Sequence, residues 1–596
     1  MTSTKERPPQ VQPPPPRRPI FGRLTRVFTE NSLAFVALFL LLWLVAGPIA
    51  LLLGMSVRTG SPSAPGEFTL NNFAAVYGSP QTYPTLINTA LYAIGVTVVS
   101  LVIAAGFAWL TERTDMPGRS FAWVIVLIPI AMPGMLASMA WILLLAPNIG
   151  IINVFLRDLL SVVGIQMETG PFNIYSLAGM IFVEGVRGAS ILFLMLVGAF
   201  RLMDPSLEEA AEVAGSSRLN SLRRVTIPIL APALMAAGVY GLIGNLDDFE
   251  TPLLIGLPAG IFLLPTIIYF SAYISPVPNW GIASAYTTIF LVIMVVLVIW
   301  YYRFVLKRAK RFATVSGKGY RPTRTSLGRW RWPAAGLFGL FFLTSVGLPI
   351  LVLIWASLLP FYELPSMEAL QSIGLQNYAD LFGQDQIVRA ATNTLLLGVA
   401  TATLTMLLAF FLSWAIVRLR VRGSVALDSL AFVPHAIPGV VMALGLLMFY
   451  LHPAVRWIGI YGTMTLLIIA MASRYIAFGT RLSNGAITQV GAELEEAAWA
   501  AGASRFTSLR RVTIPLILPM FLAGWLVIVG QAFRSLTIPF LLGTPRTETL
   551  SVRLFDMWSR QGDFAGSAAL GMTLMVTLGV ISFIGRKSIS KGFGAE

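Results

Sequence analysis

The chain has 596 residues, of which 56% are hydrophobic and only 12% are charged, and its formal net charge is +15. This composition excludes an ordinary soluble protein and favours an all-α integral membrane protein built from spanning helices. Cysteine is absent and only two histidines occur. Disulfides and thiolate sites are therefore excluded, and a histidine-based metal cage or catalytic triad is nearly excluded.

The first predicted segment is a proline-rich, basic tail at residues 1–30. Such a composition cannot bury a core, so we expect a disordered cytoplasmic tail rather than a ligand for a proline-recognition domain. The first apolar run, 33–57, is longer than the core of a typical signal peptide and lacks a convincing cleavage site. We expect it to be a retained helix.

Twelve apolar runs are long enough to span a bilayer. They lie near 33–57, 86–110, 121–145, 174–200, 228–256, 281–305, 335–358, 394–417, 424–450, 462–481, 513–542 and 567–585. The loops on the N-terminal side hold 32 of the 42 Lys and Arg residues, the opposite loops hold 7, and three lie within spans. This distribution predicts that both termini are cytoplasmic, and it makes nucleic acid a poor candidate partner.

A stretch of 26 residues occurs twice, at 207–232 and 494–519, with 18 identical positions. Other landmarks also repeat, with an offset of 305 residues in the early part of each copy (Pro133 and Pro438) and 287 later (Arg187 and Arg474). The difference predicts an insertion of 18 residues in the outer loop near 147–173. We infer two parallel six-span halves, 31–306 and 333–596, joined by a basic cytoplasmic linker at 307–332.

The repeated stretch is polar and predicts a helix, a turn and a second helix at the cytoplasmic surface. Ser206 and Glu209 match a capping box, but Glu493 replaces the serine in the second copy, so capping does not explain both glutamates. Glu208 and Glu495 add favourable charge to the first helical turn. Paired alanines permit close approach of another surface, and a glycine in each copy suits the turn that ends the helix.

The spacing of this stretch resembles the EAA loop of ABC importer permeases. The motif is Glu-Ala-Ala, three residues, Gly, and then a Val-Thr-Ile-Pro end at Val225 to Pro228 and Val512 to Pro515. The resemblance covers about residues 30–590 as two fused type I permease domains, most like the ferric-iron permeases of the bacterial inner membrane. In that family the loop is the coupling helix, which sits in a groove of the cytoplasmic ATPase.

The resemblance implies a transport subunit rather than an enzyme. Its expected partners are two copies of an ABC ATPase, which hold ATP and magnesium, together with an external solute-binding protein. The sequence has no G-x-x-x-x-G-K-[ST] phosphate loop, so this chain is not expected to bind a cofactor itself. The expected ATPase-coupling residues are Glu208, Glu209, Ala210, Ala211, Gly215, Arg223, Arg224, Glu495, Glu496, Ala497, Ala498, Gly502, Arg510 and Arg511.

Ionisable residues within spans are costly and indicate a pathway or a buried pair. The candidates are Glu184, Arg187, Asp247, Asp248, Glu250, Arg474 and Arg534. Glu184 and Arg187 are three residues apart, so they can pair on one helix. Arg474 lacks the equivalent acid, which favours a pathway or anion-binding role. Asp247 is expected to pair with Arg534 across the two halves, while an acidic lining that attracts a cation remains the alternative.

His435 is expected to be a packed loop or helix-end residue rather than an iron ligand, and His452 to be solvated; whether the chain binds a metal stays open. Ferric iron is the leading substrate by resemblance alone, with thiamine, polyamine, phosphonate and sugar phosphate as alternatives. The rival class is an ion-coupled secondary transporter with parallel halves. A membrane-embedded enzyme is least favoured because no nucleophile, base and metal set clusters in the sequence.

Overall fold

A computed structural model describes residues 35–592, apart from 205, 302, 304–324 and 419–422. The predicted tail and most of the predicted linker lie outside these residues. Helices and the loops between them make up most of the described chain, and its only named strands form one antiparallel hairpin, β1 (Arg58–Ser61) with β2 (Ala64–Phe68). Ten of its helices are long and apolar enough to cross a membrane. The predicted all-α membrane class is confirmed.

Four long helices recur in each half and form its body. They are α4 (Thr82–Arg113), α8 (Leu177–Leu202), α11 (Ile227–Leu246) and α13 (Trp280–Tyr301), then α19 (Asp385–Ser413), α22 (Met464–Gln489), α25 (Ile514–Arg534) and α28 (Phe564–Gly592). The closest packing joins α4 to α8 and α19 to α22. A Cβ at Gly185 would lie 2.7 Å from Val99, and one at Gly479 would lie 2.9 Å from Ala409. Small residues thus allow these helices to approach closely, as in other membrane bundles.

Two of the predicted spans, 121–145 and 424–450, are sharply bent. In the first half α5 (Arg119–Leu127) and η2 (Ile128–Ala131) meet α6 (Gly134–Leu145) at 96°. In the second half α20 (Ser424–Phe432) and η11 (Val433–Ala436) meet α21 (Gly439–Leu451) at 108°. Each break falls at a proline that precedes the second helix, Pro133 or Pro438, because the residue before proline avoids the helical region.

A third bent pair was not expected from the sequence. The segments η4 (Pro252–Gly256) and η5 (Leu257–Ala259) meet α12 (Leu264–Tyr269) and η6 (Phe270–Ile274) at 75°. The described residues therefore hold ten straight candidate spans, or up to thirteen with all three bent pairs. The predicted count of twelve equals the ten straight helices plus the two bent spans that the hydropathy pattern included.

The first helix of each half extends to the other half. The segment before and including α2 (Gly47–Ser56) packs on α21, where the Trp43 indole donates to the Tyr450 hydroxyl at 3.0 Å. In the second half α15 (Arg331–Phe342) packs on α5, and Phe338 stacks on Phe107 of α4 at 4.2 Å. The remainder of that helix comprises η9 (Leu343–Gly347) and α16 (Leu348–Ser357), which contact α6 and α28. This exchange joins the halves into one body.

Shorter elements connect the long helices. They include α3 (Asn71–Gly78), α17 (Met367–Gln371), α18 (Gln376–Gly383), η12 (Arg456–Ile458), α26 (Thr537–Leu542), α27 (Leu550–Asp556) and η14 (Met557–Gln561). The duplication is visible in their contacts. The Asn72 amide donates to the carbonyls of Ser56 and Arg58, and the Asn377 amide donates to those of Ser357 and Leu359.

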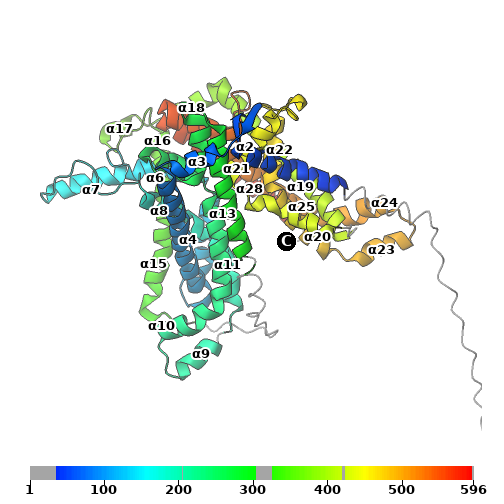
Figure 1. Cartoon of the computed structure of the whole chain (residues 1–596). Helices are drawn as coiled ribbons and strands as arrows, with labels where there is room; N and C mark the ends of the chain where they lie inside the picture. The colour runs from blue at the N-terminus through cyan, green and yellow to red at the C-terminus, as the bar shows by residue number, and fades with distance from the viewer. Residues whose placement is uncertain (1–34, 205, 302, 304–324, 419–422, 593–596) are drawn as a thin grey trace, which may run out of the picture.

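The predicted insertion near 147–173 forms an additional helix, α7 (Ile151–Val162), which projects sideways from the body (Figure 1). The buried Asn153 amide anchors its base by donating to the carbonyls of Leu145, Ala146 and Phe172. Phe155 and Leu159 on this helix are exposed. The insertion therefore forms a helix anchored to the body rather than a longer loop.

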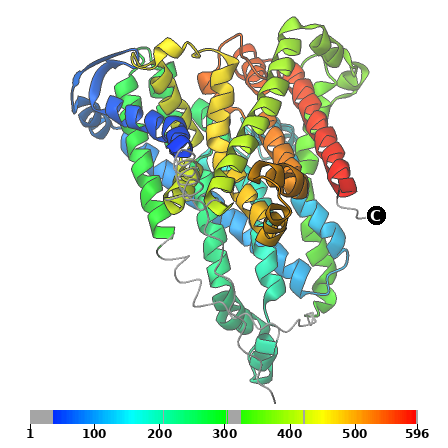
Figure 2. The ribbon, with the colours of Figure 1, turned by 90° about the vertical axis from the view of Figure 1, so that its right-hand side faces the viewer.

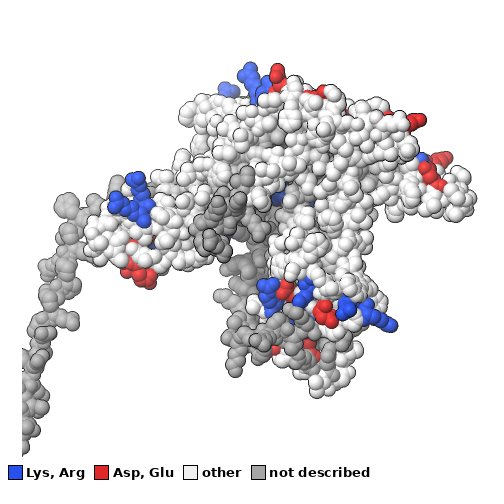
Figure 3. All heavy atoms as spheres, turned by 180° about the vertical axis from the view of Figure 1, so that it is seen from behind, with Lys and Arg blue, Asp and Glu red and all other residues white. Residues whose placement is uncertain are grey.

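The two halves diverge toward the ends that carry the repeated polar stretches. In Figure 1 the helices α4, α8 and α11 run down to α9 (Ser206–Val213) and α10 (Arg218–Ser221), whereas α19 and α25 run sideways to α23 (Ala492–Ala500) and α24 (Arg505–Ser508). Figure 2 also shows these pairs apart. Charged side chains gather at the extremities in Figure 3 and leave a broad uncharged face between them, as a membrane-embedded surface requires.

Candidate functional site

A cavity of about 360 Å³ lies between the two halves, near the middle of the long helices. Its lining includes Arg187 from α8 and Tyr240 and Asp247 from the end of α11. The second half contributes Arg474 from α22 and His435 from η11. Four of the seven predicted intramembrane charges, Glu184, Arg187, Asp247 and Arg474, line this cavity, so the structure brings these sequence-distant residues together.

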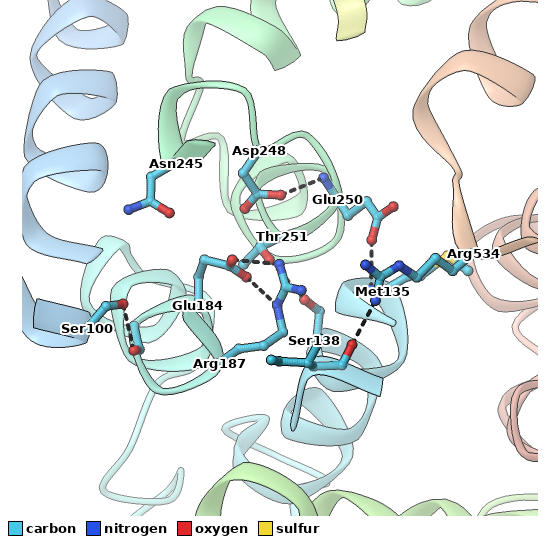
Figure 4. A network of polar contacts seen from close by, with 12 residues as sticks. Ser100, Met135, Ser138, Glu184, Arg187, Asn245, Asp248, Glu250, Thr251 and Arg534 are labelled. Atoms are coloured by element: carbon cyan, nitrogen blue, oxygen red, sulfur yellow. Dashed lines mark hydrogen bonds and ion pairs between the residues drawn. The ribbon is translucent and has the colours of Figure 1, made fainter. Parts of the chain in front are cut away.

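Glu184 and Arg187 form the predicted pair on α8. The guanidinium donates through Nε at 2.8 Å and through Nη2 at 2.6 Å to the two oxygens of Glu184. Figure 4 shows the two groups facing each other across one helical turn. This bidentate geometry is the strong form of an arginine–carboxylate contact. The prediction of a local pair is confirmed.

Asp247 joins the two halves, but through a different partner from the expected one. Its Oδ2 lies 2.5 Å from Arg474 Nη2, and its Oδ1 accepts from the Gly439 amide at 2.6 Å. Arg534 instead donates to the Ile130 carbonyl at 2.7 Å and to Gln531 at 2.8 Å. The expected Asp247–Arg534 pair is therefore wrong. Arg474 gains its counter-ion from the other half, so it is not the unpartnered guanidinium that its sequence neighbours suggested.

We call the seven intramembrane charges the charged layer. Each of the two bent spans at Pro133 and Pro438 presents a helix N-terminus to this layer. Glu250 Oε2 accepts from the Met135 amide at the start of α6 at 3.0 Å, which Figure 4 shows, and Asp247 accepts at the start of α21. Unpaired amides and the helix dipole favour negative charge at such ends. Both carboxylates come from the first half, since the positions equivalent to Asp247 and Glu250 are Arg534 and Thr537.

The other charges of the layer also have partners. Asp248 accepts hydrogen bonds from the Tyr92 hydroxyl and from the Glu250 amide, the latter at 3.2 Å. No group of three or more His, Asp or Glu residues that could hold a metal ion is found among the described residues. His435 ends a short helix as expected, but it faces the cavity, where its ring lies 6.3 Å from that of Tyr240 in the other half. His452 accepts from the Ala454 amide.

The repeated polar stretches form two matching elbows, which we define as residues 206–226 and 492–513. In each, a short helix ends at a glycine with positive φ, +85° at Gly215 and +88° at Gly502. The next amide returns to the helix, from Ser216 to the Ala211 carbonyl at 2.9 Å and from Ala503 to the Ala498 carbonyl at 3.0 Å. Both helices therefore end in the predicted glycine turn.

One turn of π-helix leads from each elbow into the next long helix, η3 (Leu222–Thr226) into α11 and η13 (Leu509–Thr513) into α25. The first elbow helix begins at Ser206 itself, whose amide donates to Asp204 at 2.9 Å. Ser206 is thus inside the helix and its amide is bound by Asp204, while the capping box with Glu209 stays a prediction. The Glu209 side chain lies outside the described residues.

Most of the expected coupling residues are on the outer surface of the elbows. Side chains that are exposed comprise Ala210, Arg223, Arg224, Glu496, Ala497, Arg510 and Arg511, while Ala211 and Ala498 are half-buried. Glu208 and Glu495 differ, because both carboxylates point into the protein. Glu495 is 7% exposed and binds Arg418, while Glu208 binds the buried Arg113. These two glutamates are therefore not part of the outward surface.

The sequence reasoning missed the inward partners of these glutamates. Arg113 and Arg418 are separated by 305 residues, which is the offset of the early landmarks, and this regularity is the signal that could have identified them. It also missed Tyr240 and Gln531 of the cavity lining. Their type and spacing are ordinary for membrane helices, so only the packing identifies them.

Known proteins resemble this chain over most of its length. Residues 406–592 match the family described as "Binding-protein-dependent transport system inner membrane component". The chain is 24% identical, over 84% of its length, to "Fe(3+)-transport system permease protein FbpB 2" of Haemophilus influenzae, of which it covers 88%. It is also 24% identical, over 83% of its length, to "Ferric transport system permease protein FbpB" of Actinobacillus pleuropneumoniae, of which it covers 69%.

Other relatives match one half. The chain is 28% identical, over 39% of its length, to "Putative 2-aminoethylphosphonate transport system permease protein PhnU" of Salmonella typhi, of which it covers 80%. A solved structure of a bacterial ABC transporter involved in the import of the acidic polysaccharide alginate is similar at a TM-score of 0.37 and 22% identity, over 44% of this chain and 97% of that chain. The family match and the ferric permeases confirm the resemblance first indicated by the repeated Glu-Ala-Ala stretch.

Proposed function

We propose that the chain is a permease of the binding-protein-dependent ABC importer type and forms the membrane pathway of a ferric-iron importer. The single observation that carries this proposal is the similarity to ferric permeases across both halves of the chain. Iron would cross between the halves through the central cavity. Its selection would rest mainly on the external solute-binding protein, since the carboxylates of the layer already have partners.

The driving force would come from two copies of a cytoplasmic ABC ATPase that bind ATP and magnesium, one at each elbow. The exposed alanines and charged residues of the elbows and the similar backbone of the two glycine turns support this arrangement. The excess of Lys and Arg in the elbow-side loops supports a cytoplasmic location for the elbows and for both termini. Closure of the ATPase pair would draw the diverging halves together and change the side to which the cavity opens.

A second candidate substrate is an anionic phosphonate. The relative named for 2-aminoethylphosphonate transport favours it. The external binding protein distinguishes the candidates, because its captured ligand would be ferric iron in one case and a phosphonate in the other.

The test is uptake by proteoliposomes that contain the chain, the ATPase and the binding protein. We expect ⁵⁵Fe uptake that requires internal ATP, and a loss of uptake when Glu496→Lys or Gly502→Val alters the second elbow. A side chain at the φ of Gly502 costs about 1–2 kcal/mol. Iron uptake by the chain alone, driven by an ion gradient, would instead establish a secondary transporter. Phosphonate uptake without iron uptake would establish the second candidate.

A further inference from the structure

A buried carboxylate fixes the base of the first elbow. Glu208 Oε2 lies 2.5 Å from Nη2 of Arg113, and its Oε1 accepts from the Thr226 hydroxyl at 2.5 Å. Arg113 also donates through Nη1 to the Met203 carbonyl at 3.1 Å, and its side chain is only 2% exposed. We call Arg113, Glu208 and Thr226 the first clamp.

The same three residue types form a second clamp in the other half. Nε of Arg418 lies 3.2 Å from Glu495 Oε1, which also accepts from the Thr513 hydroxyl at 2.6 Å. Arg418 donates through Nη2 to the Val490 carbonyl at 2.5 Å. The glutamates, threonines and carbonyls are each 287 residues apart, so the contact is duplicated along with the elbow.

Each clamp ties its elbow to three helices that continue into the membrane. Arg113 is the last residue of α4, Met203 directly follows α8, and Thr226 directly precedes α11. In the second half Arg418 ends η10 (Trp414–Arg418), which continues α19, and Thr513 directly precedes α25. The helices α8 and α22, whose ends the clamps hold, carry Arg187 and Arg474 of the cavity. About 24 Å of helix separate Met203 from Arg187.

A packing role alone would not need these charges. Removing a carboxylate and a guanidinium from water is costly, and apolar residues of the same size often stabilise such a position as well or better. Hydrogen bonds, however, fix one orientation between the elements that they join. The first clamp has the hydrogen-bonded Arg113–Glu208 ion pair, and the second has hydrogen bonds from Thr513 to Glu495 and from Arg418 to the Val490 carbonyl. The structure places these directional contacts where each elbow meets the ends of the long helices.

We propose that Arg113, Glu208 and Thr226, and likewise Arg418, Glu495 and Thr513, are positioning residues that transmit displacement of each elbow to the helices lining the cavity. The inference rests on the proposed function, because the displacement comes from the partner ATPase. Breaking a clamp leaves the outer surface of the elbow intact but lets the elbow move without its helices.

The first test measures iron transported per ATP hydrolysed in the reconstituted complex. We expect Glu208→Gln and Glu495→Gln to lower this ratio about fivefold or more while ATPase activity persists. A change of about fivefold is the lower end of the range that typical coupling free energies produce. The combined exchange Arg113→Glu with Glu208→Arg should recover part of it. Glu168→Gln changes an exposed glutamate between α7 and α8, away from both elbows. It is the matched control and should leave the ratio unchanged.

The second test does not need the partners. The chain has no cysteine, so a single cysteine at Ala214 or Ala501, both exposed, accepts a spin label at one elbow. Glu208→Gln should increase label mobility at residue 214 but not at 501, and Glu495→Gln should do the reverse. The milder Thr226→Val and Thr513→Val variants serve the same test if a glutamine variant does not fold.

The outcomes separate the two proposals. If the spin labels become more mobile but the iron transported per ATP hydrolysed does not change, the clamps do not transmit displacement. If the label mobility does not change, the clamps do not hold the elbows. If the wild-type complex fails to transport iron with ATP, the proposed function fails, while the label measurements still decide whether the clamps hold the elbows.

Discussion

Asp247 links the halves through both of its oxygens, one on the Arg474 guanidinium and the other on the Gly439 amide. The side chains of Asp247 and Arg474 are 22% and 29% exposed toward the cavity. This partial exposure places the pair between a surface ion pair and a fully buried one. Its removal therefore affects both the fit between halves and the charge of the pathway.

We expect Asp247→Asn to destabilise the protein by about 1–3 kcal/mol, because the Arg474 charge loses its counter-ion. The combined variant Asp247→Asn with Arg474→Gln should recover part of the loss. Thermal unfolding midpoints of the purified single and double variants measure this coupling. Additive losses would show that the two side chains do not interact.

Asp115 provides a pH-dependent contact outside the spans. It accepts from the Leu327 amide at 2.8 Å and from the Ser326 hydroxyl at 3.2 Å, so these donors hold the pKa of Asp115 below its usual range. Because the folded pKa is lowered, the stabilising contribution is present above the unfolded pKa and is lost as the pH falls through the folded value.

The Leu327 amide should accordingly keep a constant hydrogen-exchange protection factor from about pH 8 to about pH 5, and lose it only below the ordinary aspartate pKa of about 3.9. Asp115→Asn should lower protection across the whole range. Mass spectrometry of exchanged peptides, corrected for intrinsic exchange rates, measures this. Equal protection in the variant would contradict the assignment.

At the residue scale, the sequence predicted contacts made within one helix and missed those made between elements. The Glu184–Arg187 pair follows from a spacing of three residues, which places both side chains on one face. The partners of Asp247, Glu208 and Glu495 depend on how separate helices meet. Repeat offsets identify equivalent positions, but they do not say which positions touch.

At the scale of elements, the two proline-glycine breaks position backbone amides against carboxylates of the charged layer. Each ends a short helix in mid-span and begins another, whose first amides face a carboxylate. A glycine at the break leaves room for an arginine: a Cβ at Gly439 would lie 2.6 Å from Arg474 Nη1, and one at Gly134 would lie 3.3 Å from the Arg187 guanidinium carbon. The missing side chain at each glycine therefore leaves the space that the arginine occupies.

Gly439→Ala should displace Arg474 from Asp247 and cost about 1 to 3 kcal/mol, as expected for overpacking. Gly530→Ala on α25 is the control, since a Cβ there meets nothing within 4 Å and alanine favours a helix. Unfolding midpoints and iron uptake of the two variants test this. An alanine at 439 that behaves like the control would show that Arg474 relocates freely.

Hydropathy located these elements better than it described their shape. The ten straight candidate spans all overlap predicted apolar runs, because length and composition identify a helix that crosses lipid. The size of the bends, the third bent pair and α7 escaped prediction. An apolar run looks the same whether its helix is straight or broken, and an insertion length does not reveal a helix.

At the scale of the whole molecule, the exchanged first helices make each half incomplete alone. Phe338 and Phe341 of α15 pack on Phe107 of the first half at ring distances of 4.2 and 5.1 Å. The sequence predicted two domains with a linker, a division that follows the repeat and does not describe the packing. The first half depends on aromatic residues that follow the linker.

We therefore expect residues 1–315 expressed alone to aggregate or be degraded, because the apolar face under α15 is uncovered. Co-expression with residues 316–596 should yield an assembled pair. An affinity tag on one fragment, followed by gel filtration, measures recovery of the other. A stable, monodisperse 1–315 fragment would contradict a requirement for the exchanged helix.

The charged layer also explains why the two halves are not interchangeable. The first half supplies Glu184, Asp247, Asp248 and Glu250 with a single arginine, whereas the second supplies Arg474 and Arg534. A pair of identical first halves would concentrate uncompensated carboxylates at mid-membrane, and a pair of identical second halves would concentrate guanidiniums. Covalent fusion thus ensures a one-to-one stoichiometry during synthesis, so that every assembled pore receives complementary halves without any sorting step.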